Sequence, residues 1–223
     1  MSVPVSPNNA AITQTAETQA TITPTIAVEL LRAGNSRFVN RNPVHRDLHA
    51  QVAQTTTGQF PYAAILSCID SRIPTEIVFD QGIGDIFNAR IAGNFVNEDI
   101  LGSLEFACKL AGSKVIVVMG HTSCGAVKGA CDHAKLGNLT QMLDKIAPAV
   151  KAVQTPNGTD RSSKNLDFVN QVAIKNVTLT IEDIKSKSPV LNDMYEYGEI
   201  DIVGAMYDVA TGRVSFHTSN PPA

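Results

Sequence analysis

The chain of 223 residues contains no tryptophan, only four cysteines and few charged residues. Charged side chains make up 17% of the sequence, and 18 Lys and Arg against 21 Asp and Glu give a net charge of −3. This balance excludes a strongly basic nucleic-acid-binding protein. Four cysteines are too few for a fold held together by disulfides. Apolar residues, by contrast, make up 43% of the chain, which is enough for a sizeable core.

Long apolar runs are also missing. The longest strongly apolar run covers residues 115–119, whereas a membrane-spanning helix needs about 18 consecutive apolar residues. No Lys or Arg precedes Arg32, and no apolar segment typical of a signal peptide stands near the N-terminus. We therefore expect no membrane association and a cytoplasmic location, or a periplasmic one if a signal peptide has been removed.

The chain divides into a polar start and one larger unit. Residues 1–24 are rich in Thr, Ala, Gln, Pro and Asn and lack helical periodicity, which predicts a flexible N-terminal arm. Residues 25–223 are predicted to form a single domain. The domain begins with a helix over residues 25–38, capped by Thr25, so that the N-terminal part is a helical arm.

Short apolar runs alternate with helical patterns along the rest of the chain. Buried strands are predicted over residues 62–68, 85–89 and 114–120, and helices over residues 99–111, 139–153 and 166–184. Two final segments, residues 200–206 and 214–217, have the pattern of a hairpin. The predicted fold class is α/β, with a mostly parallel central sheet, an antiparallel C-terminal edge and flanking helices.

Potential metal ligands follow two of the predicted strands. Cys68 ends the first strand, and His121 and Cys124 follow the third. The carboxyl ends of parallel strands lie at one edge of a sheet, where ligands bind in α/β folds. Two cysteines and one histidine form a catalytic zinc set that leaves the fourth coordination position open. The sequence therefore predicts a Zn²⁺ site formed by these three residues.

Asp70 and Arg72 accompany the first ligand. In an extended segment their side chains point to the same side as that of Cys68. An aspartate and an arginine at this spacing can form a bidentate pair. The pair could simply order the loop. Alternatively, Arg72 keeps Asp70 ionised and away from the metal, and Asp70 accepts a hydrogen bond from the reacting water. We favour the second hypothesis.

The other two cysteines have simpler interpretations. Cys108 falls inside a predicted helix and is expected to fill the core or an interface. Cys131 lies close to His133, so a rival zinc set including both is conceivable. That set would leave the cysteine, aspartate and arginine of the first motif unexplained, and it is the less favoured of the two.

The two motifs together resemble those of the β-class carbonic anhydrases. The C-x-D-x-R motif of that family is matched by Cys68, Asp70 and Arg72, and the H-x-x-C motif by His121 and Cys124, with Gly125 following. The resemblance extends over residues 59–127 and, more weakly, over residues 204–212. It implies carbonate dehydratase activity (EC 4.2.1.1), a zinc lyase reaction.

The resemblance also implies a substrate site. Gln59 is expected to donate a hydrogen bond to bound substrate, Gly125 to belong to the site, and Phe87, Ala92 and Phe106 to form a narrow apolar pocket. Part of this pocket is expected to come from a neighbouring subunit of a homodimer or homotetramer. Many relatives carry valine in place of Ala92 and tyrosine in place of Phe106, and these differences would widen the pocket.

The expected reaction is the reversible hydration of CO2 to bicarbonate and a proton by a zinc-bound hydroxide. One alternative is a zinc hydrolase of a CO2-like molecule, carbon disulfide or carbonyl sulfide, on the same scaffold. A less favoured alternative is a non-catalytic, zinc-stabilised assembly protein, which would need four protein ligands. Stopped-flow CO2 hydration and the number of ligands distinguish these hypotheses.

Overall fold

A five-stranded sheet lies at the centre of the computed structural model, which describes residues 12–217. Its strands, in the order in which they lie side by side, are β2 (Ile86–Arg90), β1 (Ala63–Ser67), β3 (Val115–His121), β4 (Asp201–Tyr207) and β5 (Val214–His217). The first four run parallel, and β5 runs antiparallel to β4. The predicted fold class is confirmed.

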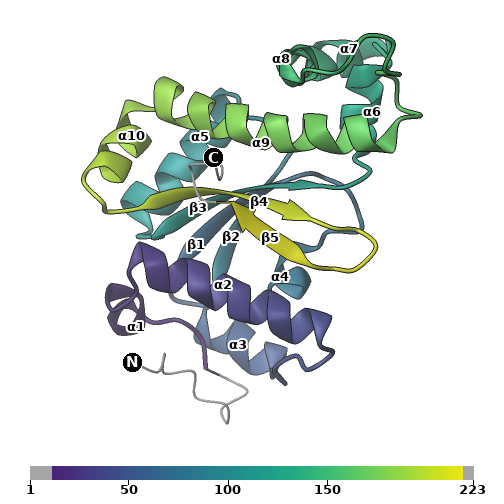
Figure 1. The fold of residues 1–223 in the computed structure, drawn as a ribbon. Helices are drawn as coiled ribbons and strands as arrows, with labels where there is room; N and C mark the ends of the chain where they lie inside the picture. Colours follow the sequence, from purple (N-terminus) through teal and green to yellow (C-terminus); the bar gives the residue numbers. More distant parts are fainter. Residues whose placement is uncertain (1–11, 218–223) are drawn as a thin grey trace.

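Helices cover both faces of the sheet (Figure 1). Below it in the figure lie α1 (Ala16–Ala20), α2 (Pro24–Val39), α3 (Leu48–Gln54) and α4 (Thr75–Val78). Above it lie α5 (Glu98–Glu105), a single π-helical turn (Phe106–Leu110), α9 (Leu166–Lys187) and α10 (Pro189–Glu196). Three short helices gather beyond one end of α9: α6 (Gly125–Cys131), α7 (Gly137–Asp144) and α8 (Ala147–Ala152).

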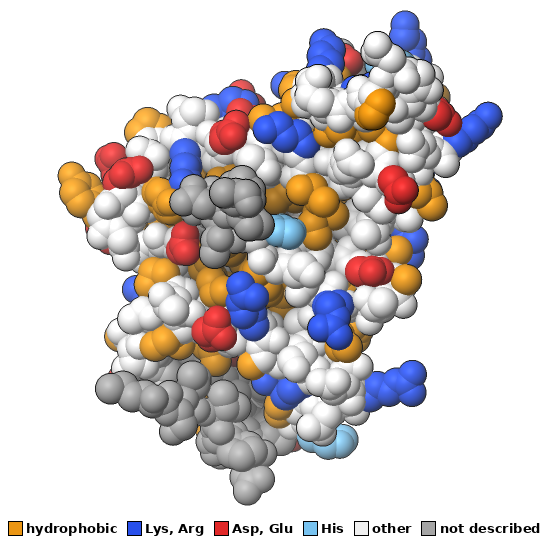
Figure 2. Space-filling view, in the orientation of Figure 1, with side chains coloured by type: hydrophobic (Ala, Val, Ile, Leu, Met, Phe, Trp, Pro, Cys, Tyr) orange, Lys and Arg blue, Asp and Glu red, His pale blue; other side chains and the backbone are white. Residues whose placement is uncertain are grey.

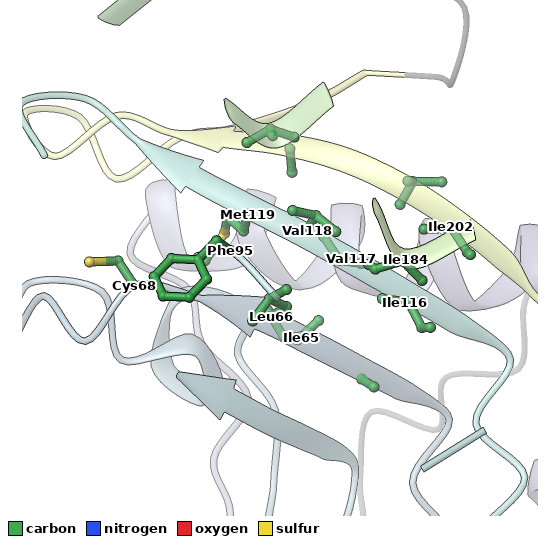
Figure 3. Close-up of a cluster of buried hydrophobic side chains, with 14 of the residues drawn as sticks. Ile65, Leu66, Cys68, Phe95, Ile116, Val117, Val118, Met119, Ile184 and Ile202 are labelled. Atoms are coloured by element: carbon green, nitrogen blue, oxygen red, sulfur yellow. The ribbon is translucent and has the colours of Figure 1, made fainter. Parts of the chain in front are cut away.

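The two central strands form the middle of the core. Every residue of β1 and β3 is buried, because both faces of these strands are covered by helices. Figure 3 shows Ile65 and Leu66 of β1 beside Val117 and Val118 of β3, with Ile184 of α9 close to them. Continuous apolar runs in the sequence therefore correspond to strands that are buried on both faces.

The N-terminal segment contains regular structure that the sequence analysis did not predict. Residues 12–24, part of the predicted flexible arm, contain α1, and Ile22 belongs to the core. The Gln19 side chain donates hydrogen bonds to the carbonyl oxygens of Pro61 and Ala111, which attach this segment to the domain. The next helix also begins earlier than predicted, at Pro24, with Thr23 as its N-cap instead of Thr25. Residues 1–11, the rest of the predicted arm, lie outside the described residues.

Two predicted helices are interrupted. The helix over residues 139–153 is in fact α7 and α8, separated after Asp144. Pro148 explains the break, because proline has no N–H to bond the carbonyl group four residues earlier. The helix over residues 99–111 begins one residue earlier and ends in the π-helical turn, where Ala111 N–H donates to the Phe106 carbonyl.

The surface agrees with the small net charge. On the face shown in Figure 2, acidic and basic side chains are interspersed and no large patch of one sign appears. Among the helices of residues 12–217, none is long and apolar enough to cross a membrane.

Candidate metal centre

Two neighbouring strands bring three potential metal ligands together. Cys68 follows the last residue of β1, and His121 is the last residue of β3. Because these strands pair in parallel, their carboxyl ends lie at the same edge of the sheet. Cys124 follows His121 by three residues and is the N-cap of α6. The two sulfur atoms and a ring nitrogen all lie within 4.8 Å of one another.

The histidine is oriented for coordination. Nδ1 of His121 lies 3.0 Å from the carbonyl oxygen of Thr122. A carbonyl oxygen only accepts hydrogen bonds, so Nδ1 carries the proton and Nε2 presents its lone pair. Nε2 is buried, and no residue of the described chain gives it a hydrogen-bond partner. A buried nitrogen of this kind, facing two sulfur atoms, fits a metal ligand.

The two cysteines interact as a pair. The pKa of Cys68 is lowered to about 4, and the largest cause is a hydrogen bond with the Cys124 thiol. His121 and the Gly93 N–H also lower this pKa, whereas burial raises it. The same hydrogen bond, together with burial, raises the pKa of Cys124. The hydrogen bond between the two thiols therefore favours ionisation of Cys68 over ionisation of Cys124. Two sulfur ligands and one imidazole match the ligand set that zinc prefers at catalytic sites.

Asp70 and Arg72 form a bidentate ion pair beside these ligands. Arg72 donates from Nε to Oδ1 of Asp70 at 2.9 Å and from Nη2 to Oδ2 at 2.7 Å. These hydrogen bonds hold the pKa of Asp70 well below its usual range. Oδ2 of Asp70 lies 3.9 Å from Nε2 of His121, so an ionised carboxylate stands at the edge of the ligand cluster.

A second arginine, which the sequence analysis missed, holds this loop. Arg90 ends β2 and donates from Nε to the Cys68 carbonyl at 2.9 Å and from Nη2 to the Asp70 carbonyl at 2.6 Å. The sequence could have indicated this role, because Arg90 directly follows the second predicted strand, and the carboxyl ends of parallel strands lie together. Arg90 thus binds backbone carbonyl oxygens of this loop, whereas the Asp70 carboxylate is bound by Arg72.

The rival metal set is not formed. Cys131 is the last residue of α6, and His133 is exposed in the turn that follows. Within residues 12–217, the cluster of Cys68, His121 and Cys124 is the one group of potential ligands close enough to hold a metal ion. Three protein ligands leave a coordination position open, which argues against a closed structural site.

The residues predicted to bind substrate fall into two groups. Gly125 is the first residue of α6, and Ala92 precedes Gly93, whose N–H contacts Cys68, so both lie beside the centre. Gln59 precedes β1 and therefore lies at the opposite end of that strand from Cys68.

The two phenylalanines also lie away from the metal ligands of their own chain. Phe87 pairs with Ala64, four residues and about 13 Å before Cys68 along β1. Phe106 packs edge-on against Phe87, with ring centroids 6.1 Å apart, and is half exposed. Both line a hollow of about 620 Å³ along the β2 edge of the sheet.

Comparison with known proteins identifies the family. The sequence model of the family described as "Carbonic anhydrase" matches residues 63–214, more than half of the chain. Carbonic anhydrase 2 of Mycobacterium tuberculosis is 34% identical over 85% of this chain and 91% of its own length. The carbonic anhydrase of Mycolicibacterium smegmatis is 32% identical over 87% and 94%.

A solved structure gives the same result for the fold. The β-carbonic anhydrase CafA of Aspergillus fumigatus is 28% identical, with a TM-score of 0.65 over 78% of this chain and 84% of that one. The family, the fold and the cluster of two cysteines and a histidine agree with one another. The chain therefore belongs to the β class of carbonic anhydrases, and its reaction is the reversible hydration of CO2 to bicarbonate and a proton.

Proposed function

We propose that the metal is zinc, held by Cys68, His121 and Cys124. The observation that carries this proposal is the buried, unpartnered Nε2 of His121, in a cluster with the two cysteine sulfur atoms at the carboxyl ends of β1 and β3. When bound, zinc supplies a Lewis acid that lowers the pKa of a coordinated water toward neutrality. The lowered pKa of the Cys68 thiol favours capture of the cation, and the deprotonation of Cys124 would add the second negative charge that balances the 2+ charge of the ion.

In this proposal Asp70 orients the attacking water. Its carboxylate stays ionised because Arg72 donates two hydrogen bonds to it, and an ionised carboxylate is purely a hydrogen-bond acceptor. An acceptor 3.9 Å from the histidine nitrogen is placed to accept a hydrogen bond from that water and so to orient it. Arg72 also contacts the Ser123 carbonyl at 3.5 Å, which connects the two ligand loops.

We further propose that the CO2 pocket is completed by a second copy of the chain. Gln59, Phe87 and Phe106 lie too far along the sheet to reach the metal ligands of their own chain. Phe87 lies on β2 and Phe106 packs against it, and the outer edge of β2 has no neighbouring strand within the described part of the chain. A second copy seated on this edge would bring its Gln59 and its aromatic side chains to the first copy's site, and it would cover the hollow.

The zinc proposal is tested by measuring metal content and activity together. We expect one zinc per chain and CO2 hydration by stopped flow that disappears on chelation and returns with zinc. Turnover of carbon disulfide or carbonyl sulfide without CO2 hydration would favour the alternative hydrolase. Tight zinc binding with no turnover of any of the three would favour the assembly protein.

The shared pocket is tested by mixing two inactive variants. In a mixed dimer of Asp70→Asn and Gln59→Ala chains, the Gln59→Ala chain keeps its own Asp70 and receives Gln59 from its partner. If the pocket is shared, co-refolding the two variants restores activity that neither possesses alone. If Gln59 acts within its own chain, or the active protein sediments as a monomer, mixing restores nothing and the proposal is wrong.

A further inference from the structure

A buried asparagine far along the chain is connected to the Cys68 sulfur through one glycine. Nδ2 of Asn176, on α9, donates a hydrogen bond to the Gly93 carbonyl oxygen at 2.7 Å. The N–H of the same glycine donates to Sγ of Cys68 at 3.3 Å. Helix α9, the loop after β2 and the first metal ligand are thereby joined in a series of two hydrogen bonds.

Gly93 has a conformation and a packing environment that only glycine fits. Its φ angle is +84°, in the region that side chains rarely adopt. A Cβ atom at this position would stand 2.4 Å from Cδ1 of Ile146, which is itself fully buried. The backbone of Gly93 is therefore pressed against the protein interior, with its N–H aimed at the cysteine sulfur.

Asn176 is well placed to fix this glycine. Its side chain is 3% exposed and belongs to the face of α9 that packs on the domain. Among residues 12–217, the Asn176 amide is the one hydrogen-bond donor that reaches the Gly93 carbonyl oxygen. Without this donor the buried carbonyl group of Gly93 would have no hydrogen-bond partner, which is unfavourable. The backbone of Gly93 would then be free to shift, and its N–H would move relative to the Cys68 sulfur.

We infer that Asn176 is a positioning residue of the metal centre, acting through Gly93 on the Cys68 thiolate. This inference rests on the zinc centre proposed above. An N–H hydrogen bond fixes the direction of the sulfur lone pairs and withdraws charge from the thiolate, which tunes how strongly the sulfur binds a cation. Partners of metal ligands act in this way in other metalloproteins, where their replacement changes affinity or activity by about 10- to 100-fold.

The experiment compares three variants of the full chain. Asn176→Ala removes the donor, and Asn176→Asp keeps the shape but replaces the donor with an oxygen. Thr180→Ala is the matched control: Thr180 lies one turn further on α9 and is equally buried. Zinc affinity is measured by competition with a chromophoric chelator, and the cobalt-substituted proteins are compared by their sulfur-to-cobalt charge-transfer absorption.

We expect both Asn176 variants to bind zinc about ten-fold or more weakly than the unmodified chain. We also expect a shifted charge-transfer band, because the hydrogen bond to the sulfur is disturbed. Thr180→Ala should change neither property. If Asn176→Ala does not fold, the isosteric Asn176→Asp variant carries the test.

Two results would overturn the inference. One is zinc affinity and a cobalt spectrum in the Asn176 variants that equal those of the unmodified chain. The other is an equal loss in Thr180→Ala, which would indicate packing of α9 and not the hydrogen bond. If the unmodified chain binds no zinc, it is the zinc proposal that fails, so the two failures are distinguishable.

Discussion

The four cysteines form two pairs that are equally buried and chemically different. Their exposed fractions are 4% for Cys68, 1% for Cys124, 2% for Cys108 and 6% for Cys131. Burial alone raises the pKa of Cys108 to about 12, and burial is also the main cause that raises the pKa of Cys131 to about 11. Cys68 has the Cys124 thiol and the Gly93 N–H as hydrogen-bond partners, and its pKa falls to about 4. Cys68 therefore differs from Cys108 and Cys131 in its polar neighbours and not in its burial.

The largest effect expected from this comparison is on metal binding. Cys68→Ala and Cys124→Ala should each lose zinc and reduce CO2 hydration to the uncatalysed rate, because two ligands no longer form a stable site. Cys108→Ala and Cys131→Ala should retain zinc and most of the activity. Atomic absorption and stopped-flow hydration measure both properties. Loss of zinc in Cys131→Ala would mean that the rival ligand set is used after all.

A somewhat smaller effect is expected at Asp70. Asp70→Asn keeps the shape of the side chain but replaces one acceptor oxygen with a donor, so we expect kcat/KM to fall about 100-fold or more. Zinc content should stay unchanged, because Asp70 is not one of the three clustered ligands. Asp132→Asn, at an exposed aspartate that accepts a hydrogen bond from Ser163, is the matched control. A loss of zinc in Asp70→Asn would give this residue a structural role.

The reactivities of Cys68 and Cys131 after chelation should differ in their dependence on pH. With a pKa of about 4, Cys68 is almost fully ionised at about pH 6 and above. Once zinc is removed, its alkylation by iodoacetamide should be nearly constant from about pH 6 to about pH 9. Cys131 is protonated below about pH 11, so its slow alkylation should rise about ten-fold per pH unit. Peptide mass spectrometry measures both rates, and parallel profiles would contradict the comparison.

The smallest expected effect concerns stability without metal. Cys108 lies in the π-helical turn among apolar side chains, so Cys108→Ala should cost about 1 kcal/mol of unfolding free energy. Cys108→Ser should cost more, since a buried hydroxyl group there finds no partner. At Cys68 the order should reverse, because a serine hydroxyl can accept the Gly93 N–H. Urea unfolding of the metal-free proteins measures the stability of the Ala and Ser variants at each position. If Ser were less stable than Ala at both positions, the result would contradict the comparison.

Much of this molecule could be predicted from local sequence. Parallel strands with both faces buried appear as continuous apolar runs, so β1 and β3 were recognisable. The candidate ligands follow those strands directly, which placed Cys68 and His121 at one edge of the sheet. The break at Pro148 and the helix near the N-terminus were missed. The short helix α1 is attached to the domain by hydrogen bonds from Gln19 to backbone carbonyl oxygens far away in the sequence. The sequence pattern around α1 gives no information about such contacts.

The parts that only the tertiary structure decided are contacts between segments far apart in the chain. The sequence by itself determined the fold class, the two cysteines and the histidine that gather, and the pairing of Asp70 with Arg72, because all of these depend on strand ends and short spacings. It could not show that Asn176 reaches Gly93, 83 residues earlier, or that Arg90 holds the Cys68 loop. Nor could it show that Gln59 and Phe87 lie away from their own metal centre. Such contacts depend on how helices and loops pack around the sheet, and the packing is fixed only when the whole domain has folded.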